Sequence, residues 1–356
     1  MPPFHIREAT SDDSPALQNL QAHSPQGTGL RFTTVNKPDF FARSRLYERP
    51  RVFVAEQDGV LLGSAACGLR EVVLEGQPLW AGYEFQYFVD PAHRRKGVAS
   101  ALHRRIETAL REAGAAFSYL LVAEDNLPSM RLFERQGFAL YRTLRAPFVL
   151  PYKAMSAAGQ GAVRPAVPAD LPVVADLLNA TWDGFTFYKP HTAESLQAAF
   201  ARMEGFSLDN LFVLERNHGG IAACVGYWDW RKITEITVQA LNFRLKAIRT
   251  ALNLARLVTS VPSLPGPGET LTQWCLTPVG FTSPNALRAV LVSINNRALE
   301  EKVGQLFLVG ERRAHWFSAL RGFFTADTLT HLYLKPLDEA LTLPENAPVF
   351  LDAVDV

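Results

Sequence analysis

The sequence has few cysteines and almost no excess of charge. Its three cysteines, Cys67, Cys224 and Cys275, lie far apart along the chain, which argues against a disulfide framework or a zinc site. The formal net charge of +1 gives no support to a nucleic-acid or membrane-surface partner, because such partners usually require an excess of basic residues. We therefore expect buried thiols in a reducing compartment, and neither nucleic acid nor a membrane as a partner.

Long apolar runs are missing as well. Charged residues break the mostly apolar segments within about a dozen positions, short of the roughly 20 residues that cross a bilayer. The amino terminus lacks the basic region and apolar core of a signal peptide. No metal-ligand cluster, Ser/His/Asp arrangement or Walker-type phosphate loop stands out. We expect a cytoplasmic protein without a bound metal.

The second half of the chain repeats the opening of the first half. Residues 163–178, VRPAVPADLPVVADLL, mirror residues 6–20, IREATSDDSPALQNL, and residues 211–228 mirror residues 52–69. So long a period indicates two duplicated domains rather than a solenoid. A chain of 356 residues, 48% of them hydrophobic, can bury two sizeable cores.

The segment 151–163 is rich in small residues and separates the two repeats. Such a composition is typical of a linker, so we expect domains at 1–155 and 156–356. Alternatively, the segment holds a last strand of the first domain, ending near Met155, and a shorter linker follows it.

Local patterns predict the elements of both domains. In the first domain they predict strands over 4–8, 70–76, 83–89 and 117–123, a hairpin over 51–69, helices over 10–21, 38–47 and 126–138, a helix that opens at 94–99 and ends at Gly114, and turns over 22–38. In the second domain they predict a helical insertion at about 234–260, a loop over 261–270, a strand over 271–281 and a helix from 283.

The turn that opens the helix after the 83–89 strand is cationic and contains a glycine. Arg94, Arg95 and Lys96 precede Gly97, and glycine lets a ligand approach the backbone closely. The first four N–H groups of a helix lack an intrahelical partner, and the helix dipole is positive there, so phosphate oxygens can accept those hydrogen bonds. The turn predicts a site for a ligand with several phosphates. A solvated basic turn is the alternative.

Two patterns surround this turn. The first is V-x-P-x-x-R-x-x-G-x-A, formed by Val89, Pro91, Arg94, Gly97 and Ala99. The second is N-x-x-(small)-x-x-L-(Tyr)-x-x-x-G-F, formed by Asn126, Ser129, Leu132, Phe133, Gly137 and Phe138. With both patterns, the segment resembles the nucleotide-binding core of the GNAT superfamily of N-acetyltransferases. The resemblance implies an α/β (α+β) fold of two GNAT-like domains in tandem, each a twisted mixed, mostly antiparallel sheet flanked by helices.

The resemblance also implies that acetyl-coenzyme A is the co-substrate. The loop amides would hold its pyrophosphate, the end of the 83–89 strand would meet its pantetheine arm, and the 126–138 helix would touch its far side. The residues expected to bind the coenzyme are Phe88, Val89, Arg94, Arg95, Lys96, Gly97, Val98, Ala99, Ser100, Asn126, Ser129 and Phe133. The second domain lacks R-x-x-G-x-A, so we expect it to have lost the coenzyme and to be structural or to complete the acceptor pocket.

Acetyl transfer to an amine requires a base, because the attacking amine must be neutral. Glu84 is the carboxylate inside the central strand and is the first candidate for this base. By simple alternation, Tyr83 and Tyr87 share the other strand face, where they would hold a water relay or line the pocket. A bulge in this strand would change these faces. We assign Glu84 and Tyr87 as the catalytic candidates.

The family pattern often has Tyr where this chain has Phe133, and Phe has no proton for the leaving thiolate. Either another hydroxyl, such as that of Tyr141 or Ser129, donates this proton, or the thiolate leaves without direct help. Its pKa of about 8.5 makes it a tolerable leaving group.

Acceptor recognition is expected in the region before the 51–69 hairpin. Arg43, Arg45 and Tyr47 are candidates for binding a carboxylate of the substrate, and His93 for binding phosphate or the acceptor. The expected reaction is direct transfer of acetyl to a small-molecule amine by a monomer or homodimer. The alternatives are a non-catalytic acyl-coenzyme A sensor and a protein or peptide N-acetyltransferase.

Overall fold

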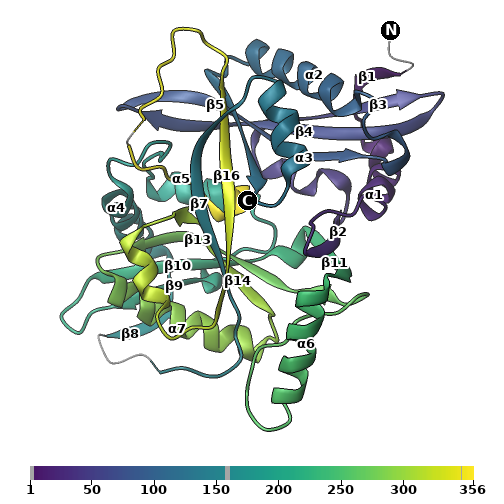
Figure 1. The fold of residues 1–356 in the computed structure, drawn as a ribbon. Coiled ribbons are helices and arrows are strands. Elements are labelled where there is room, and N and C mark those ends of the chain that lie inside the picture. Colours follow the sequence, from purple (N-terminus) through teal and green to yellow (C-terminus); the bar gives the residue numbers. More distant parts are fainter. Residues whose placement is uncertain (1–3, 157–160, 346) are drawn as a thin grey trace.

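The computed structural model describes residues 4–156, 161–345 and 347–356. One 13-stranded mixed sheet runs through both halves of the chain, in the order β1-β3-β4-β5-β6-β16-β7-β14-β13-β10-β9-β8, with β15 paired to β7 (Figure 1). Antiparallel pairs predominate, and the β5–β6 and β13–β14 pairs are parallel. The expected α/β architecture of mostly antiparallel sheet flanked by helices is confirmed.

The first half contains β1 (His5–Glu8), α1 (Ser14–Ala22), β2 (Leu30–Asn36), β3 (Glu48–Gln57), β4 (Val60–Leu74), β5 (Gln77–Val89), α2 (Val98–Glu112), β6 (Phe117–Ala123), α3 (Leu127–Arg135) and β7 (Ala139–Val149). The second half contains β8 (Ala162–Pro165), α4 (Leu171–Trp182), α5 (Ala193–Arg202), β9 (Leu211–Glu215), β10 (Ile221–Asp229), β11 (Thr234–Leu241), α6 (Phe243–Ala255), β12 (Thr270–Leu271), β13 (Gln273–Phe281), α7 (Pro284–Glu300), β14 (Gln305–Phe307), β15 (Gly310–Glu311) and β16 (Thr325–Pro336).

The same ion triad marks the repeat in both halves. In each half, an arginine of the first strand forms an ion pair with an aspartate ahead of the first helix, at 2.7 Å. The same arginine also pairs with a glutamate of the neighbouring strand. The repeated polar arrangement agrees with the repeat in the sequence. The residues are Arg7, Asp13 and Glu56 in the first half, and Arg164, Asp170 and Glu215 in the second half.

The two halves exchange their last strands. β16, from the second half, lies between β6 and β7 of the first half, and β7 pairs in turn with β14 of the second half (Figure 1). Leu332 and Leu334 of β16 are buried in the largest hydrophobic cluster, which contains residues from both halves. Since each half completes the sheet of the other, the boundary predicted at 155/156 marks the sequence repeat within one continuous sheet.

Two predicted segments take a different form. Residues 30–36, expected as turns, form β2, and residues 234–241, expected as the start of a helix, form β11; the two strands pair with each other. Only Phe243–Ala255 of the predicted insertion is helical. The pairing joins residues about 200 positions apart (Thr234 with Asn36), and local periodicity carries no information on such partners. In addition, 70–76 is not a separate strand but continues β4 to Leu74, and 38–47 forms two 3-10 turns.

Candidate active site

The loop between β5 and α2 is open to solvent. Arg95 and Gly97 adopt positive φ angles of 63° and 84°, and a Cβ added to Gly97 would meet no atom within 4 Å. The first hydrogen bond of α2 joins the Gly97 carbonyl to the Ala101 N–H at 3.0 Å, and Gly97 has no side chain to cap the helix. The N–H groups of residues 98–100 therefore face the exposed turn without an intrahelical partner, as an anion site requires.

β5 and β6 part directly behind this loop. They pair at Ala81–Phe117, Gly82–Ser118 and Tyr83–Tyr119, and no further pair joins them among the described residues. We call the opening between residues 84–89 of β5 and residues 120–123 of β6 the first fork. Over these residues, the two strand edges face each other without hydrogen bonds between them. Their backbone N–H and C=O groups are therefore available to the amides of a ligand. Phe88 and Val89 lie on this edge, next to the loop.

A β-bulge in β5 changes the faces of its side chains. Ser64 pairs with Phe88 and Ala66 with Phe85, so Gln86 and Tyr87 together oppose one residue of β4, and Gln86 has a φ of 54°. The extra residue moves Tyr87 to the face that carries Glu84. The prediction that Tyr83 and Tyr87 share a face is therefore wrong, because simple alternation stops at the bulge.

Glu84 is buried on the face of the sheet that α2 covers. Its Oε1 accepts a hydrogen bond from the Ser118 hydroxyl at 2.6 Å, and its Oε2 accepts one from the Tyr87 hydroxyl. His103 of α2, also buried, has its Nδ1 3.0 Å from the same Oε2. Burial, reinforced by the Glu84 charge, raises the pKa of Tyr87 well above its ordinary value. The structure thus brings the two catalytic candidates into direct contact and keeps Tyr87 protonated.

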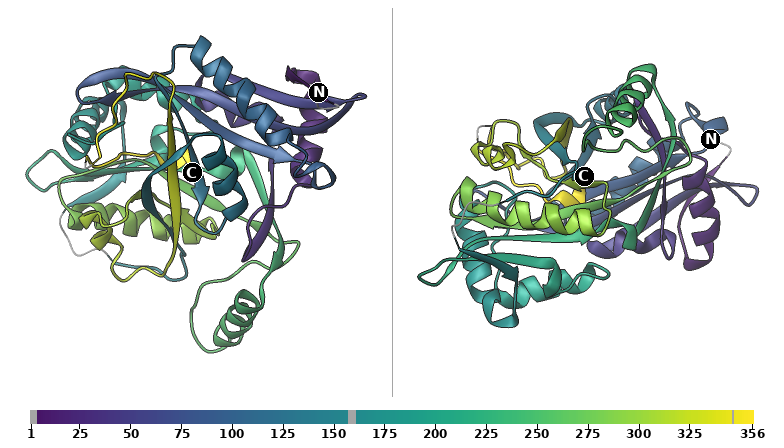
Figure 2. Two further views of the ribbon diagram at one scale, coloured as in Figure 1. Left: turned by 45° about the horizontal axis from the view of Figure 1, so that its top comes forward. Right: turned by 90° about the horizontal axis from the view of Figure 1, so that it is seen from below.

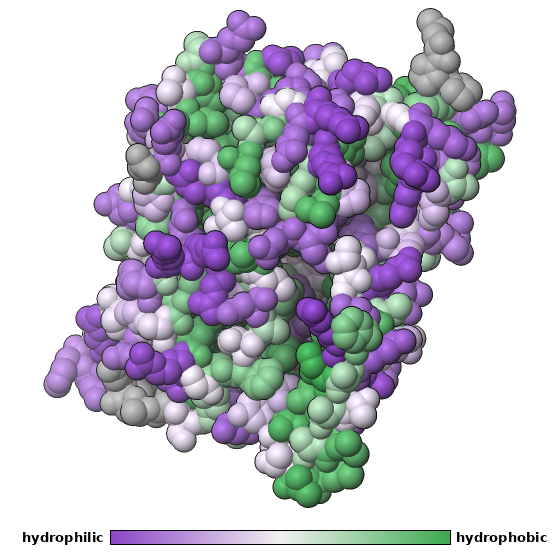
Figure 3. Space-filling view, in the orientation of Figure 1, coloured by the Kyte–Doolittle hydropathy of each residue, from purple (hydrophilic) through white to green (hydrophobic). Residues whose placement is uncertain are grey.

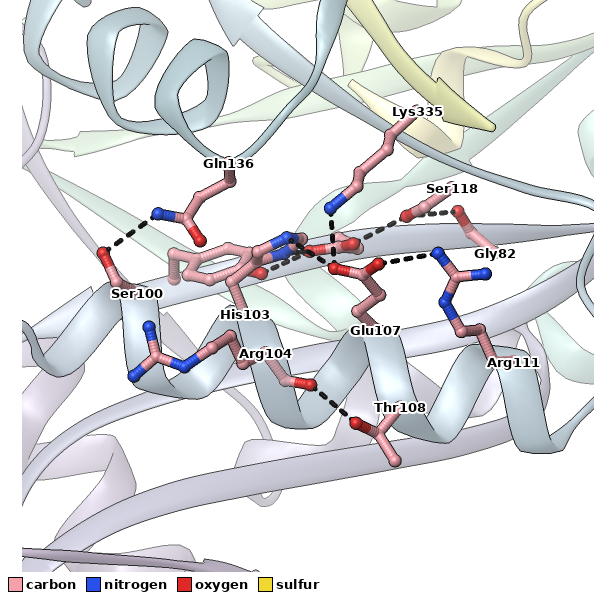
Figure 4. A network of polar contacts seen from close by, with 12 residues as sticks. Gly82, Ser100, His103, Arg104, Glu107, Thr108, Arg111, Ser118, Gln136 and Lys335 are labelled. Atoms are coloured by element: carbon pink, nitrogen blue, oxygen red, sulfur yellow. Dashed lines mark hydrogen bonds and ion pairs between the residues drawn. The ribbon is translucent and has the colours of Figure 1, made fainter. Parts of the chain in front are cut away.

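The contacts continue from His103 to the surface of the protein. Its Nε2 lies 3.5 Å from the Glu107 carboxylate, and Glu107 pairs with Lys335 of β16 at 2.6 Å and with Arg111 at 2.9 Å (Figure 4). The exchanged strand β16 therefore supplies one cation to this network. Hydrogen-bond contacts therefore connect Tyr87, Glu84 and His103, whereas the His103 Nε2 is near Glu107 but makes no hydrogen bond within the part of the chain that the structure describes.

Helix α3 forms the other wall beside Tyr87. Asn126 caps the helix by accepting a hydrogen bond from the Ser129 N–H at 3.3 Å. Phe133 packs edge-on against Tyr87, with 5.1 Å between ring centroids. Gln136 donates to the Ser100 hydroxyl at 3.3 Å and so ties α3 to the first turn of α2. Position 133 has no hydroxyl because it is a phenylalanine, but the adjacent Tyr87 provides one.

On the opposite face of β5, a buried carboxylate lies at the apex of the first fork. Asp355 accepts hydrogen bonds from Tyr47 at 3.1 Å and Tyr119 at 3.4 Å, and pairs with Arg70 at 2.6 Å. The Tyr83 hydroxyl donates to its backbone carbonyl. Tyr83 and Tyr119 are the last paired residues before the strands part. Burial raises the pKa of Asp355, although Arg70 opposes this shift.

Sequence reasoning did not include Asp355 among the candidates. The local signal is a pair of aspartates, Asp352 and Asp355, within the mostly apolar stretch VFLDAVDV, and Arg70, the partner of Asp355, lies 285 positions away. No spacing rule connects such residues. The carboxyl-terminal end of the chain lies near the centre of the molecule in all three views (Figures 1 and 2).

Of the three predicted acceptor residues, two reach this cluster. Arg43 lies 3.4 Å from the Tyr83 hydroxyl and 3.3 Å from the Asp355 carbonyl, and its guanidinium stands 5.6 Å from the ring of Trp230 of the second half. Tyr47 is the second. Arg45 instead pairs with Asp39 at the surface, at 3.0 Å.

Other candidates lie outside the cluster. His93 has its Nδ1 3.2 Å from Asp90 at the edge of the loop, and Tyr141 donates to the Pro344 carbonyl at 2.5 Å. All three cysteines are free and buried, as predicted, and burial raises the pKa of Cys67 to about 12, so its thiol is a poor nucleophile. Within 4–156, 161–345 and 347–356, no cluster of His, Cys, Asp and Glu has the composition of a metal site, and no helix is both long and apolar enough to span a bilayer.

The second half contains a corresponding fork with a different content. β13 and β14 pair from Gln273–Gln305 to Cys275–Phe307 and then part, and β13 carries a bulge at Thr277 and Pro278. The Ser283 hydroxyl caps α7 by accepting from the Ala286 N–H at 3.2 Å. A cavity of about 50 Å³ remains in this second fork. Its lining includes the aromatic side chains of Trp182, Tyr188, Trp316 and Phe350.

Comparison with known proteins agrees with this geometry. The model of the acetyltransferase (GNAT) family matches residues 16–138, which include the loop, the first fork and α3. The phosphinothricin N-acetyltransferase of Streptomyces viridochromogenes is 29% identical over 147 residues, which cover 40% of this chain and 79% of that protein.

Solved structures are similar over almost the whole chain. N-myristoyltransferase of Saccharomyces cerevisiae with bound myristoyl-CoA aligns with a TM-score of 0.64 and 11% identity, covering 94% of this chain and 79% of that one. A GCN5-related N-acetyltransferase from Sphaerobacter thermophilus aligns with a TM-score of 0.58 and 13% identity, covering 96% and 98%. These identities show a common fold. The family match covers the loop, the first fork and α3, so this part of the chain is a GNAT acetyltransferase domain, and the protein is an acyltransferase that uses acyl-coenzyme A.

Proposed function

We propose that the first fork transfers the acetyl group of acetyl-coenzyme A to the amine of a small molecule, by direct attack in a ternary complex. One observation carries this proposal: β5 and β6 part immediately behind the uncapped, cationic start of α2. A diphosphate bound to the helix start would lead its pantetheine arm into the fork. The amides of residues 95–99 would hold the diphosphate, with Phe88 and Val89 beside the arm and Asn126, Ser129 and Phe133 along the other wall.

Asp355 is the best-placed base for the acceptor amine. It lies at the apex of the fork, on the face opposite α2, and its raised pKa favours proton acceptance. Glu84, the candidate from the sequence, is held by Ser118, His103 and Tyr87 on the α2 face. We assign Glu84 the role of orienting Tyr87, from whose hydroxyl it accepts a hydrogen bond.

Tyr87 is the proposed proton donor to the leaving thiolate. Its ring packs against Phe133, the position from which a tyrosine often acts in this family. Its hydroxyl remains protonated because burial raises its pKa. After donation, the contact of Tyr87 with Glu84, and of Glu84 with His103, offers a route for a replacement proton.

The acceptor pocket favours a small amine that carries an anionic group. Arg70 pairs with the Asp355 carboxylate, whereas Arg43 contacts the Asp355 backbone carbonyl. An anionic group on the acceptor would therefore balance the charge of Arg43. Trp230 and residues 351–355 of the second half close this face, which limits the room for a long chain. The relative from Streptomyces viridochromogenes is named for acetyl transfer to phosphinothricin, which supports a small acceptor.

A second candidate is the transfer of a longer acyl chain. It is favoured by the fold shared with an N-myristoyltransferase that has myristoyl-CoA bound. The thioester donors in the test below therefore range from acetyl to myristoyl.

The proposal is tested by coenzyme A release from each donor in the presence of amino acids, polyamines, aminoglycosides and short peptides. We expect the fastest release with acetyl-coenzyme A and an amino acid or similar anionic amine. The Arg94→Ala/Gly97→Val variant is the negative control. Coenzyme binding without amine-dependent release across the panel would instead assign the protein as an acyl-coenzyme A sensor, and release only with peptides would refute the small-molecule acceptor.

A further inference from the structure

Helix α6 and the loop that follows it form an arm that projects from the body of the protein (Figures 1 and 2). We define the arm as residues 242–268. It begins where the Asn242 N–H donates to the Gly29 carbonyl at 2.9 Å, and Arg249 holds the returning loop by donating to the Leu264 carbonyl at 3.0 Å. No residue of α6 is buried, so hardly any packing against the body stabilises this helix.

The arm exposes an unusual amount of apolar surface. Of the eleven large hydrophobic side chains that are exposed in the described residues, five belong to the arm. They are Phe243, Ile248, Leu254, Leu257 and Val258, with exposed fractions of 76, 50, 62, 80 and 86%. The two largest fractions lie just beyond the carboxyl-terminal end of α6, at the end of the arm farthest from the body, where Figure 3 shows a hydrophobic patch.

The charge of the arm has one sign. No acidic residue occurs between Glu235 and Glu269, whereas four basic residues do: Arg244, Lys246, Arg249 and Arg256. The chain as a whole carries +1, so the residues outside this segment carry −3. A basic helix with an exposed apolar face is typical of segments that lie in the interface of a bilayer.

We propose that the arm docks the protein on an anionic lipid surface. The apolar end, with Leu254, Leu257 and Val258, would enter the region between headgroups and acyl chains. Behind it, Arg244 and Lys246 would contact the lipid phosphates, whereas Arg249 pairs with Glu269 at 2.9 Å. The negative body would stay off the surface, which fixes the orientation. With 13 residues, α6 is too short to span the bilayer and lies on it.

The charge also disfavours a second copy of the chain as the occupant. A symmetric dimer through this face would bring two arms of charge +4 together, and like charges at such an interface are repulsive. An anionic bilayer complements both features of the arm, its apolar end and its positive charge. The proposal differs from the expectation that the near-zero net charge excludes a membrane partner, because the charge is unevenly distributed.

The test uses the full-length protein and sedimentation with two kinds of vesicle, phosphatidylcholine alone and phosphatidylcholine mixed with phosphatidylglycerol. We expect binding about tenfold or more tighter to the anionic vesicles, and weaker as salt is added. Leu254→Ser/Leu257→Ser/Val258→Ser should abolish binding. Arg244→Gln/Lys246→Gln should remove the preference for anionic lipid.

The matched control is Val167→Ser/Val173→Ser, which changes two exposed apolar side chains of the second half outside the arm and should bind like the original protein. Circular dichroism checks that each variant is folded. Absence of vesicle binding, or equal binding by the triple variant, would overturn the proposal. So would a concentration-dependent dimer in analytical ultracentrifugation that the triple variant dissolves, since the arm would then contact a second copy.

Discussion

The two forks of this protein have the same construction and different contents. In each, a parallel strand pair parts after a few residues, and a bulge places two residues opposite one in the neighbouring strand. The first fork ends in an uncapped glycine turn, whereas the side chain of Ser283 occupies the helix start of the second. The two halves therefore share this sheet geometry and differ in a few side chains within it.

The bulges show the difference at the level of single residues. Gln86 and Tyr87 form the bulge of the first fork, and Thr277 and Pro278 form that of the second. The position of the Tyr87 hydroxyl thus corresponds to a proline, which has no proton to donate. Aromatic residues such as Trp316 line the cavity of about 50 Å³ that remains in the second fork. The second half nevertheless supplies β16 and Asp355 to the first, which explains how it persists without the phosphate loop.

The largest effect is expected from Asp355→Asn, which removes the proposed base at the apex of the first fork. The turnover number should fall about 100-fold or more, with coenzyme affinity unchanged, as steady-state kinetics and calorimetry would measure. Since the base must be deprotonated and its pKa is raised, the acid limb of the kcat/KM profile should lie above pH ~4 and disappear in the variant.

Asp176→Asn is the control, because Asp176 is an exposed aspartate on α4 of the second half. Its turnover should stay close to that of the original protein. Equal rates for Asp355→Asn and the original protein would exclude Asp355 as the base and leave Glu84 as the candidate.

Coenzyme binding should depend on the loop of the first fork. Arg94→Ala/Gly97→Val removes one charge and places a β-branched residue at a φ of 84°, so we expect the dissociation constant for acetyl-coenzyme A to rise about 100-fold. Gly59→Val is the matched control, because Gly59 has a φ of 77° in a hairpin turn and equally open surroundings. A folded double variant that binds as tightly as the original protein in calorimetry would contradict the assignment of the loop.

Tyr87→Phe should reduce the turnover number about tenfold and leave coenzyme affinity unchanged, because the leaving thiolate loses its proton donor. Phe133→Tyr in the same chain should restore part of the rate by returning a hydroxyl to the family position. Rapid-quench measurement of the first turnover separates this effect from product release. If both single and double variants turn over at the original rate, the thiolate leaves without help from this side chain.

Ser283→Ala should affect stability alone. Loss of the cap of α7 should lower the free energy of unfolding by about 1 kcal/mol, which urea denaturation can resolve, while the affinity for acetyl-coenzyme A stays the same. A change in that affinity would indicate that the second fork also binds the coenzyme.

The smallest effects concern the two ion triads. Arg7 lowers the pKa of Asp13 to about 2, and Arg164 lowers that of Asp170. A depressed pKa stabilises the folded state above the ordinary pKa of about 4 and loses this contribution as pH falls toward 2. Asp13→Asn and Asp170→Asn should each cost about half a kcal/mol at neutral pH, because these pairs are partly exposed.

The cost of both triad variants should shrink in urea denaturation as the pH falls from about 4 to about 2. A large cost in one half and none in the other would show that the duplicated triads no longer have equivalent roles.

Much of the candidate site could be predicted from the sequence because its signals are local. The turn before α2 depends on neighbours such as Arg94 and Gly97, and the strand over 117–123 and the helix beginning after Asn126 follow from short patterns. Tyr87 was a candidate, but its face depended on a bulge, which arises from the register with β4. The contact between Tyr87 and Phe133 could not be read from spacing.

The sequence by itself determined the duplication, the phosphate loop and the family pattern of this protein, because each depends on residues close together in the chain. The tertiary structure alone decided the exchange of β7 and β16, the pairing of β2 with β11, and the arrival of Asp355 beside Arg70, 285 positions away. Such contacts form when the whole sheet closes and its core is buried. Their energy depends on partners that no local pattern identifies.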